Sequence, residues 1–483
     1  MIRTARDNSR SMNFAAAAVV RNGCVRWSRL ATIAGLALTA GFGSSAVAAT
    51  QNSSTGRVFQ NLSTLRSQAS CGDARAMYVL GVMHANGRGI GENDVEAARW
   101  YGLAADAGHA DAMTNLGVLH ARGEGVERDD ERAVCLYRKA AEAGSARAMT
   151  ILAARCANGD AAKRDEAEAV RWYQRAAEAG DGAAMFLLGS MYANGRGTKQ
   201  DGVKAMYWYR LSADAGEARA MTAIGAAYAG VGGAARAVSK HPREAARWFA
   251  RAADAGDVTA MANLGAAYLA GEGVSKNLEL GRKWLQTAAE CGDALAMVAL
   301  GDHHSLGESV ACDYAQAHRW YSRAAGLGHA GAVVNLGVLH AEGRGVATDA
   351  AEAARLFQIA AEAGAAEAML NLSGLYREGR GVERDMALAY FWARNAVASY
   401  NGSLDAAVGR YCREIGKSLT PAMRAEVEDR HRVWICRQEK VSATPHALCS
   451  AVAIGFAQSP VTPAGLEQSQ DAQAVVDTAL PRE

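Results

Sequence analysis

Apolar residues recur along most of this chain with a period of 36 residues. A Leu-Gly pair, or a close variant of it, follows this spacing nine times, from Leu80 to Leu372. The single departure is an interval of 40, which about four additional residues near 230–236 produce. A fixed period of 20–50 residues indicates a solenoid, in which each unit buries its apolar face on its neighbours. The pattern therefore predicts nine repeats over residues 72–399.

Polar and glycine positions divide each repeat into two predicted helices. A glycine heads all nine repeats, from Gly72 to Gly364, and is expected to end the preceding helix in a left-handed conformation. Most residues at the next position are types that can cap a helix N-terminus. A Gly-x-Gly loop follows the first helix in six repeats, and Asp or Asn precedes the second helix in every repeat except one, where His241 stands. With no strand signal anywhere, the expected fold is all-α and built from helix–turn–helix units.

Two columns of large apolar residues indicate the core. Methionine occupies one position in eight of the nine repeats, and seven of the nine tryptophans occupy another. We interpret the tryptophans as packing anchors between layers, in preference to a stacked-aromatic ligand site. The glycine of each Leu-Gly pair falls in mid-helix, where it costs roughly 1 kcal/mol relative to alanine. The expected reason is the close approach of a neighbouring helix.

These positions together resemble the Sel-1-like repeat, a relative of the tetratricopeptide repeat. The stretches "AMANLGAAYLAGEGVSKN" and "AMFLLGSMYANGRGTKQDGVKAMYWYRLSADAG" show the pattern well, and the resemblance covers residues 72–399. Ser418–Trp434 also resembles the helix that often closes such arrays. The resemblance implies a right-handed α/α superhelical solenoid with a concave groove and a C-terminal helical cap. It further implies an adaptor, since family members assemble complexes, act in signalling, or bind host factors when bacterial and exported.

The N-terminus carries the features of an export signal. Six arginines within the first 29 residues precede the apolar run "LATIAGLALTAGFG" and an Ala-Val-Ala cleavage site at 46–48. We therefore expect a signal peptide over 1–48 and a bacterial protein that is periplasmic or secreted, with no stable membrane span after cleavage. The alternative is an N-terminal membrane anchor, because Leu30–Ala49 is just long enough to cross a bilayer.

Composition sets the remaining boundaries. Residues 49–71 form a polar lead-in, 400–438 a helical cap, and 439–483 a tail rich in Ala, Gln, Ser and Pro that is expected to be flexible. The formal net charge of +2 provides no basic footprint, so a nucleic-acid partner is not expected.

No catalytic, metal or cofactor site is predicted. Four histidines share one repeat column with tyrosines, which indicates packing better than metal binding: His84, His120, His304 and His340. The chain contains no Ser-x-x-Lys, no His-Glu-x-x-His and no phosphate loop. Few or no disulfides are expected within the array, because its cysteines do not form a pair in every repeat. We therefore expect a protein that is not an enzyme.

One polar column is a candidate binding surface. Four asparagines precede Leu-Gly on the first helix of their repeats: Asn115, Asn263, Asn335 and Asn371. In related superhelices this helix lines the concave face. An asparagine side chain can pair with both the backbone N–H and the C=O of an extended peptide. We predict a peptide groove here; the competing interpretation is that these are neutral surface residues.

The sequence thus favours an exported scaffold that binds one or more proteins or peptides through the concave face, in envelope complex assembly or signalling. Two alternatives differ only in the partner: a regulator that binds a sensor kinase, and a secreted factor that binds host proteins. A third is a β-lactam-binding or β-lactam-hydrolysing enzyme, which the missing nucleophile motifs disfavour.

Overall fold

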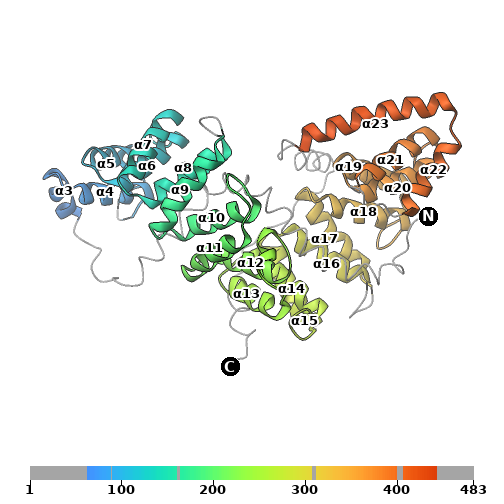
Figure 1. Ribbon diagram of the computed structural model, residues 1–483, viewed down its shortest axis with the longest axis horizontal. Helices are drawn as coiled ribbons and strands as arrows, with labels where there is room; N and C mark the ends of the chain where they lie inside the picture. Colours follow the sequence, from blue (N-terminus) through green and yellow to red (C-terminus); the bar gives the residue numbers. More distant parts are fainter. Residues whose placement is uncertain (1–61, 89, 160–163, 307–311, 400–405, 443–483) are drawn as a thin grey trace. The chain divides into compact units, whose positions relative to one another are not determined.

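The computed structural model describes residues 62–88, 90–159, 164–306, 312–399 and 406–442 (Figure 1). Within these residues the chain forms 21 α-helices and one 3-10 helix, and no strand. The all-α fold and the helix–turn–helix repeats are therefore confirmed. The chain divides into two compact units between Ala255 and Gly256, and each is described by itself. The predicted signal peptide lies outside the described residues.

The unit before Gly256 holds five repeats, each made of a first and a second helix. Its first helices are α4 (Ala74–Asn86), α6 (Ala110–Arg122), α8 (Ala146–Asn158), α10 (Gly182–Asn194) and α12 (Ala218–Tyr228). Its second helices are α5 (Asp94–Asp106), α7 (Asp130–Glu142), α9 (Glu166–Glu178), α11 (Gly202–Asp214) and α13 (Pro242–Asp254). The additional residues of the fifth repeat include the 3-10 helix η2 (Gly233–Ala237), which packs on α11 and α12.

The unit from Gly256 onward holds four repeats and the cap. Its first helices are α14 (Val258–Ala270), α16 (Ala294–Leu306), α18 (Ala330–Glu342) and α20 (Ala366–Glu378). Its second helices are α15 (Leu278–Glu290), α17 (Tyr314–Gly326), α19 (Ala350–Glu362) and α21 (Met386–Ser399). Two further helices, α22 (Ala406–Lys417) and α23 (Pro421–Ser442), pack on α21.

The predicted capping columns determine where the helices begin. Every second helix starts with a side chain that accepts a hydrogen bond from the backbone N–H two or three residues later. His241 was expected to be the exception at this capping position, but it also caps its helix. Its Nδ1 accepts a hydrogen bond from the Glu244 N–H at 3.3 Å. An unprotonated imidazole nitrogen is an acceptor like a carboxylate oxygen, so histidine serves as a cap here.

The mid-helix glycines confirm the expected close approach and identify the neighbour. The neighbour is the second helix of the same repeat, and the contact is made by an aromatic ring in most repeats. A Cβ atom on Gly117 would lie 2.7 Å from Tyr137, and one on Gly189 would lie 2.7 Å from Tyr209. In the repeat that begins at Gly256 the neighbour is aliphatic, because Gly265 faces Leu285 at 2.8 Å. Where this position is a glycine, it thus makes room for a large side chain on the second helix of the same repeat.

The tryptophan column is less buried than its interpretation as a packing anchor requires. The buried anchor is the next residue, for example Tyr173 and Phe249. Trp172 and Trp248 are half-buried, and the guanidinium groups of arginines lie 4.7 Å and 4.4 Å from their ring centroids. Only Trp284 and Trp392 of this column are buried, so the packing role holds fully for these two alone.

Both ends of the array carry helical caps. At the N-terminal end, α3 (Leu62–Ser70) lies inside the segment expected to be a polar lead-in, and it packs Leu65 and Ala69 on α4. At the C-terminal end, α23 continues to Ser442, four residues beyond the expected boundary at 438. A buried hydrogen bond between His431 Nδ1 and Asn395 Oδ1 joins α23 to α21.

Candidate partner-binding face

The four predicted asparagines occupy one position on the first helices, but their surroundings differ. Asn115 lies on α6 in one unit, and Asn263, Asn335 and Asn371 lie on α14, α18 and α20 in the other. Asn263 is only 7% exposed, whereas the other three are half-buried. Asn115, Asn335 and Asn371 therefore have solvent access for a ligand, and Asn263 has the least.

Asn115 bonds to the next repeat. The Arg147 guanidinium, on α8, donates to its Oδ1 at 3.1 Å. Tyr78 from the preceding repeat lies close by, and its ring stacks on the imidazole of His109 with centroids 4.5 Å apart. Burial raises the pKa of Tyr78, and the Asp111 carboxylate raises it further. Three successive repeats thus contribute aromatic, amide and charged groups to one place on the first helices.

Asn335 bonds to the preceding repeat. Its Nδ2 donates to Asp302 Oδ1, on α16, at 3.2 Å. The Tyr321 hydroxyl, on α17, donates to the same oxygen at 2.7 Å. Burial raises the pKa of Asp302 to about 6, although the hydrogen bond from Tyr321 acts in the opposite direction.

Further side-chain bonds connect neighbouring first helices. The Thr114 hydroxyl lies 3.3 Å from the Ser145 hydroxyl of the next repeat, and Thr150 donates to Asp181 at 3.0 Å. Sequence reasoning found the asparagines but missed Arg147 and Asp302. The sequence could have identified Asp302 as a candidate, because it is charged at a repeat position that is otherwise uncharged. Nothing in the sequence identifies Arg147 as a candidate, since only the structure shows that it contacts Asn115.

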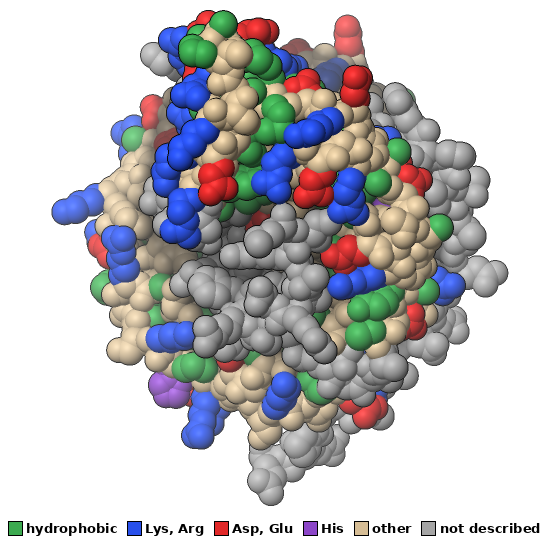
Figure 2. Space-filling model, turned by 90° about the vertical axis from the view of Figure 1, so that its right-hand side faces the viewer, with side chains coloured by type: hydrophobic (Ala, Val, Ile, Leu, Met, Phe, Trp, Pro, Cys, Tyr) green, Lys and Arg blue, Asp and Glu red, His purple; other side chains and the backbone are tan. Residues whose placement is uncertain are grey.

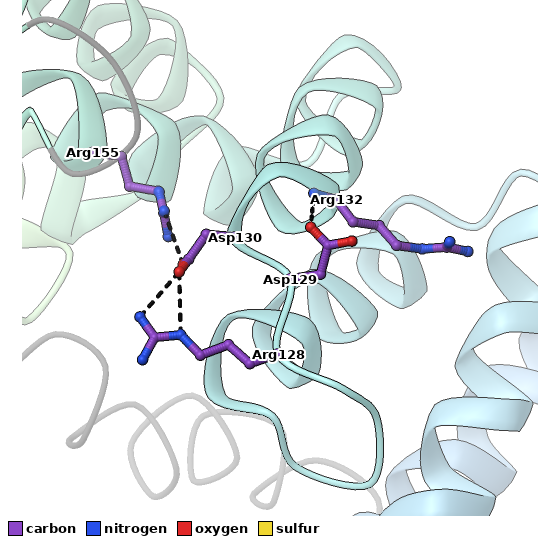
Figure 3. A network of polar contacts seen from close by, with 5 residues as sticks. All are labelled: Arg128, Asp129, Asp130, Arg132 and Arg155. Atoms are coloured by element: carbon purple, nitrogen blue, oxygen red, sulfur yellow. Dashed lines mark hydrogen bonds and ion pairs between the residues drawn. The ribbon is translucent and has the colours of Figure 1, made fainter.

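A second set of contacts joins repeats at the N-termini of the second helices (Figure 3). Asp130, the first residue of α7, accepts from Arg128 at 3.0 Å and 3.2 Å, and from Arg155 of the next repeat at 3.3 Å. The hydrogen bond from Arg128 is the main cause of the lowered pKa of Asp130. Asp129 beside it points elsewhere and caps the helix through the Arg132 N–H (Figure 3). These contacts join neighbouring repeats through residues other than the four asparagines.

The described residues contain no group of three side chains arranged to hold a metal ion. The seven described cysteines are free in the structure.

On the face shown in Figure 2, acidic and basic side chains are interspersed, with hydrophobic side chains between them in its upper part. No helix in the described part of the chain combines the length and the apolar character needed to cross a membrane.

Comparison with known proteins identifies the class. The family model described as "Sel1 repeat" matches residues 74–109, 110–145, 146–181, 182–217, 218–257, 258–293, 294–329, 330–364 and 366–399. This chain of paired helices therefore belongs to the Sel1 repeat family. Sel1 repeats generally mediate protein binding, and the fold is typically a non-catalytic scaffold.

A solved structure shares the fold, and a second was found by the same comparison. The protective antigen c5321 of uropathogenic Escherichia coli, described as displaying an SLR fold, is 24% identical, with a TM-score of 0.50 and coverage of 85% of this chain and 100% of its own. A Sel1 repeat protein from Oxalobacter formigenes is 32% identical, with a TM-score of 0.44 and coverage of 48% of this chain and 100% of its own. No curated protein matches the chain.

Proposed function

We propose that this protein is an exported scaffold that binds protein partners on the first-helix face, in envelope complex assembly or signalling. The observation that carries the proposal is that the first helices of each unit carry half-buried amides, at Asn115 in one unit and at Asn335 and Asn371 in the other. Two of them already bond to a neighbouring first helix, through Arg147 and Asp302. Each amide group can still accept or donate further hydrogen bonds, because asparagine offers two donors and an acceptor with two lone pairs.

An extended peptide matches this chemistry. It presents an unpaired N–H and C=O at every residue, which the amides can satisfy without selecting a particular side chain. Specificity would then come from the groups that differ between repeats, such as the stacked Tyr78–His109 pair and the Asp302 carboxylate. This division between general backbone contacts and particular side-chain contacts suits an adaptor.

Export is supported by the N-terminal sequence, in which arginines, an apolar run and a small-residue cleavage site follow one another over 1–48. Cell fractionation tests this part separately. Recovery from the periplasm supports the envelope role, recovery from the medium favours a secreted factor, and recovery with the membrane favours the anchored form.

The binding face is tested by replacing all four asparagines with alanine in the tagged full-length protein. A net hydrogen bond contributes about 0.5–1.5 kcal/mol, so loss of two or more weakens partner binding by about fivefold or more. The measurement is the affinity for the partner captured by crosslinking in cells. Asn86→Ala with Asn194→Ala is the matched control, because both asparagines are exposed at the C-terminal ends of first helices. Unchanged affinity in the fourfold variant would reject the asparagine face.

A further inference from the structure

Asp302 departs from the pattern of its own repeat position. The residue after Leu-Gly is small or apolar, and never charged, in the other eight repeats: Val82, Val118, Ala154, Ser190, Ala226, Ala266, Val338 and Gly374. A half-buried carboxylate costs free energy that these side chains do not, because burial removes water from the charge. The charge therefore requires an explanation beyond the helix packing that all nine repeats share.

Hydrogen bonding to the neighbouring tyrosine does not supply that explanation. In the fourth repeat, the Ser190 hydroxyl lies 3.3 Å from the Tyr209 hydroxyl. Ser190 and Tyr209 occupy the same repeat positions as Asp302 and Tyr321. A neutral hydroxyl thus meets the same tyrosine without the cost of a buried charge.

The carboxylate is arranged to receive a further group. The hydrogen bonds from Tyr321 and Asn335 both end on Oδ1, and neither uses Oδ2. No cation among the described residues forms an ion pair with Asp302. Both donors are uncharged, so the negative charge is held in position without being neutralised.

We propose that Asp302, held by Tyr321 and Asn335, binds the ammonium or guanidinium group of a lysine or arginine side chain on the partner protein. The proposal deepens the scaffold function, on which it rests, by assigning a cationic side chain to one place on the first-helix face. Charge-assisted hydrogen bonds to a carboxylate are stronger than neutral ones, and a partly desolvated carboxylate strengthens them further. Asn335 lies beside the carboxylate, where its amide oxygen can accept from the backbone of the same partner.

The test uses probes that do not require the partner. N-acetyl-arginine amide, N-acetyl-lysine amide and the uncharged N-acetyl-norleucine amide are titrated into full-length protein at constant ionic strength. The readout is the side-chain amide NMR signal of Asn335. A saturable shift is expected with the two cationic probes and not with norleucine. Asp302→Ser, which copies Ser190 of the fourth repeat, is expected to weaken that binding at least fivefold, and Asp302→Asn serves as a second uncharged variant.

Two results would overturn the proposal. One is an absence of saturable binding to the wild-type protein, and the other is equal binding by wild type, Asp302→Ser and Asp302→Asn with unchanged melting temperatures. Partner capture separates this proposal from the scaffold function. If the fourfold asparagine variant loses the partner while Asp302→Ser retains it, the scaffold stands and the cation site falls.

Discussion

Replacing Gly381 with alanine is expected to lower the free energy of unfolding by about 2–5 kcal/mol, from two separate causes. Gly381 has a φ of 70°, and a left-handed conformation costs a non-glycine residue roughly 1–2 kcal/mol. A Cβ atom there would also overlap the backbone of Ala350 in the preceding repeat, and such overpacking costs typically about 1–3 kcal/mol. Urea denaturation followed by circular dichroism measures the change.

Gly364→Ala separates the two causes. Gly364 has a φ of 90°, but a Cβ atom there would meet nothing within 4 Å. This control is expected to show only the conformational cost of roughly 1–2 kcal/mol. An equal loss of unfolding free energy in both variants would contradict this explanation. It would mean that the close contact between the Gly381 loop and the start of α19 does not contribute to stability.

Gly265→Leu is expected to lower the free energy of unfolding by roughly 1–3 kcal/mol, because the new side chain must displace Leu285 and the Gly281 carbonyl. Gly374→Leu is the matched control in the same compact unit, since Gly374 also lies within a first helix but meets nothing within 4 Å. The control is expected to be neutral or stabilising by up to about 1 kcal/mol, as glycine is a poor helix former. An unchanged melting temperature for Gly265→Leu would contradict the close-contact account.

The fold was predictable because its signals are local and occur nine times. Glycines at the ends of helices, such as Gly108 with a φ of 87°, and caps such as Asp129 act within a few residues of the chain. Each signal is weak by itself, but its recurrence at the same position of successive repeats makes it recognisable. His241 was misjudged because its residue type differs from that column, although its ring nitrogen accepts the same hydrogen bond.

Side-chain burial and the contacts between helices could not be predicted from the sequence, because they depend on how separate helices pack together. Trp172 and Tyr173 are adjacent aromatic residues, and only packing decides that the tyrosine is buried while the tryptophan remains half-exposed beneath an arginine. Likewise, Asn115 was identifiable as a polar position, but its bond to Arg147 spans 32 residues. Segment α3 was missed because only two of its side chains are buried, too few for a clear helical pattern.

Site-specific photocrosslinking tests the central claim, which is that the partner binds the first-helix face. The photoreactive residue p-benzoylphenylalanine replaces Val118 or Val338, which lie three residues after Asn115 and Asn335 on the same sides of their helices. For comparison, it replaces Val95 and Val203, which are 62% and 69% exposed on second helices.

Circular dichroism first confirms that each variant folds. We predict that, in cells, one partner protein crosslinks at Val118 or Val338 and not at Val95 or Val203. Crosslinks that form only at the second-helix positions, or equally at all four, would contradict it.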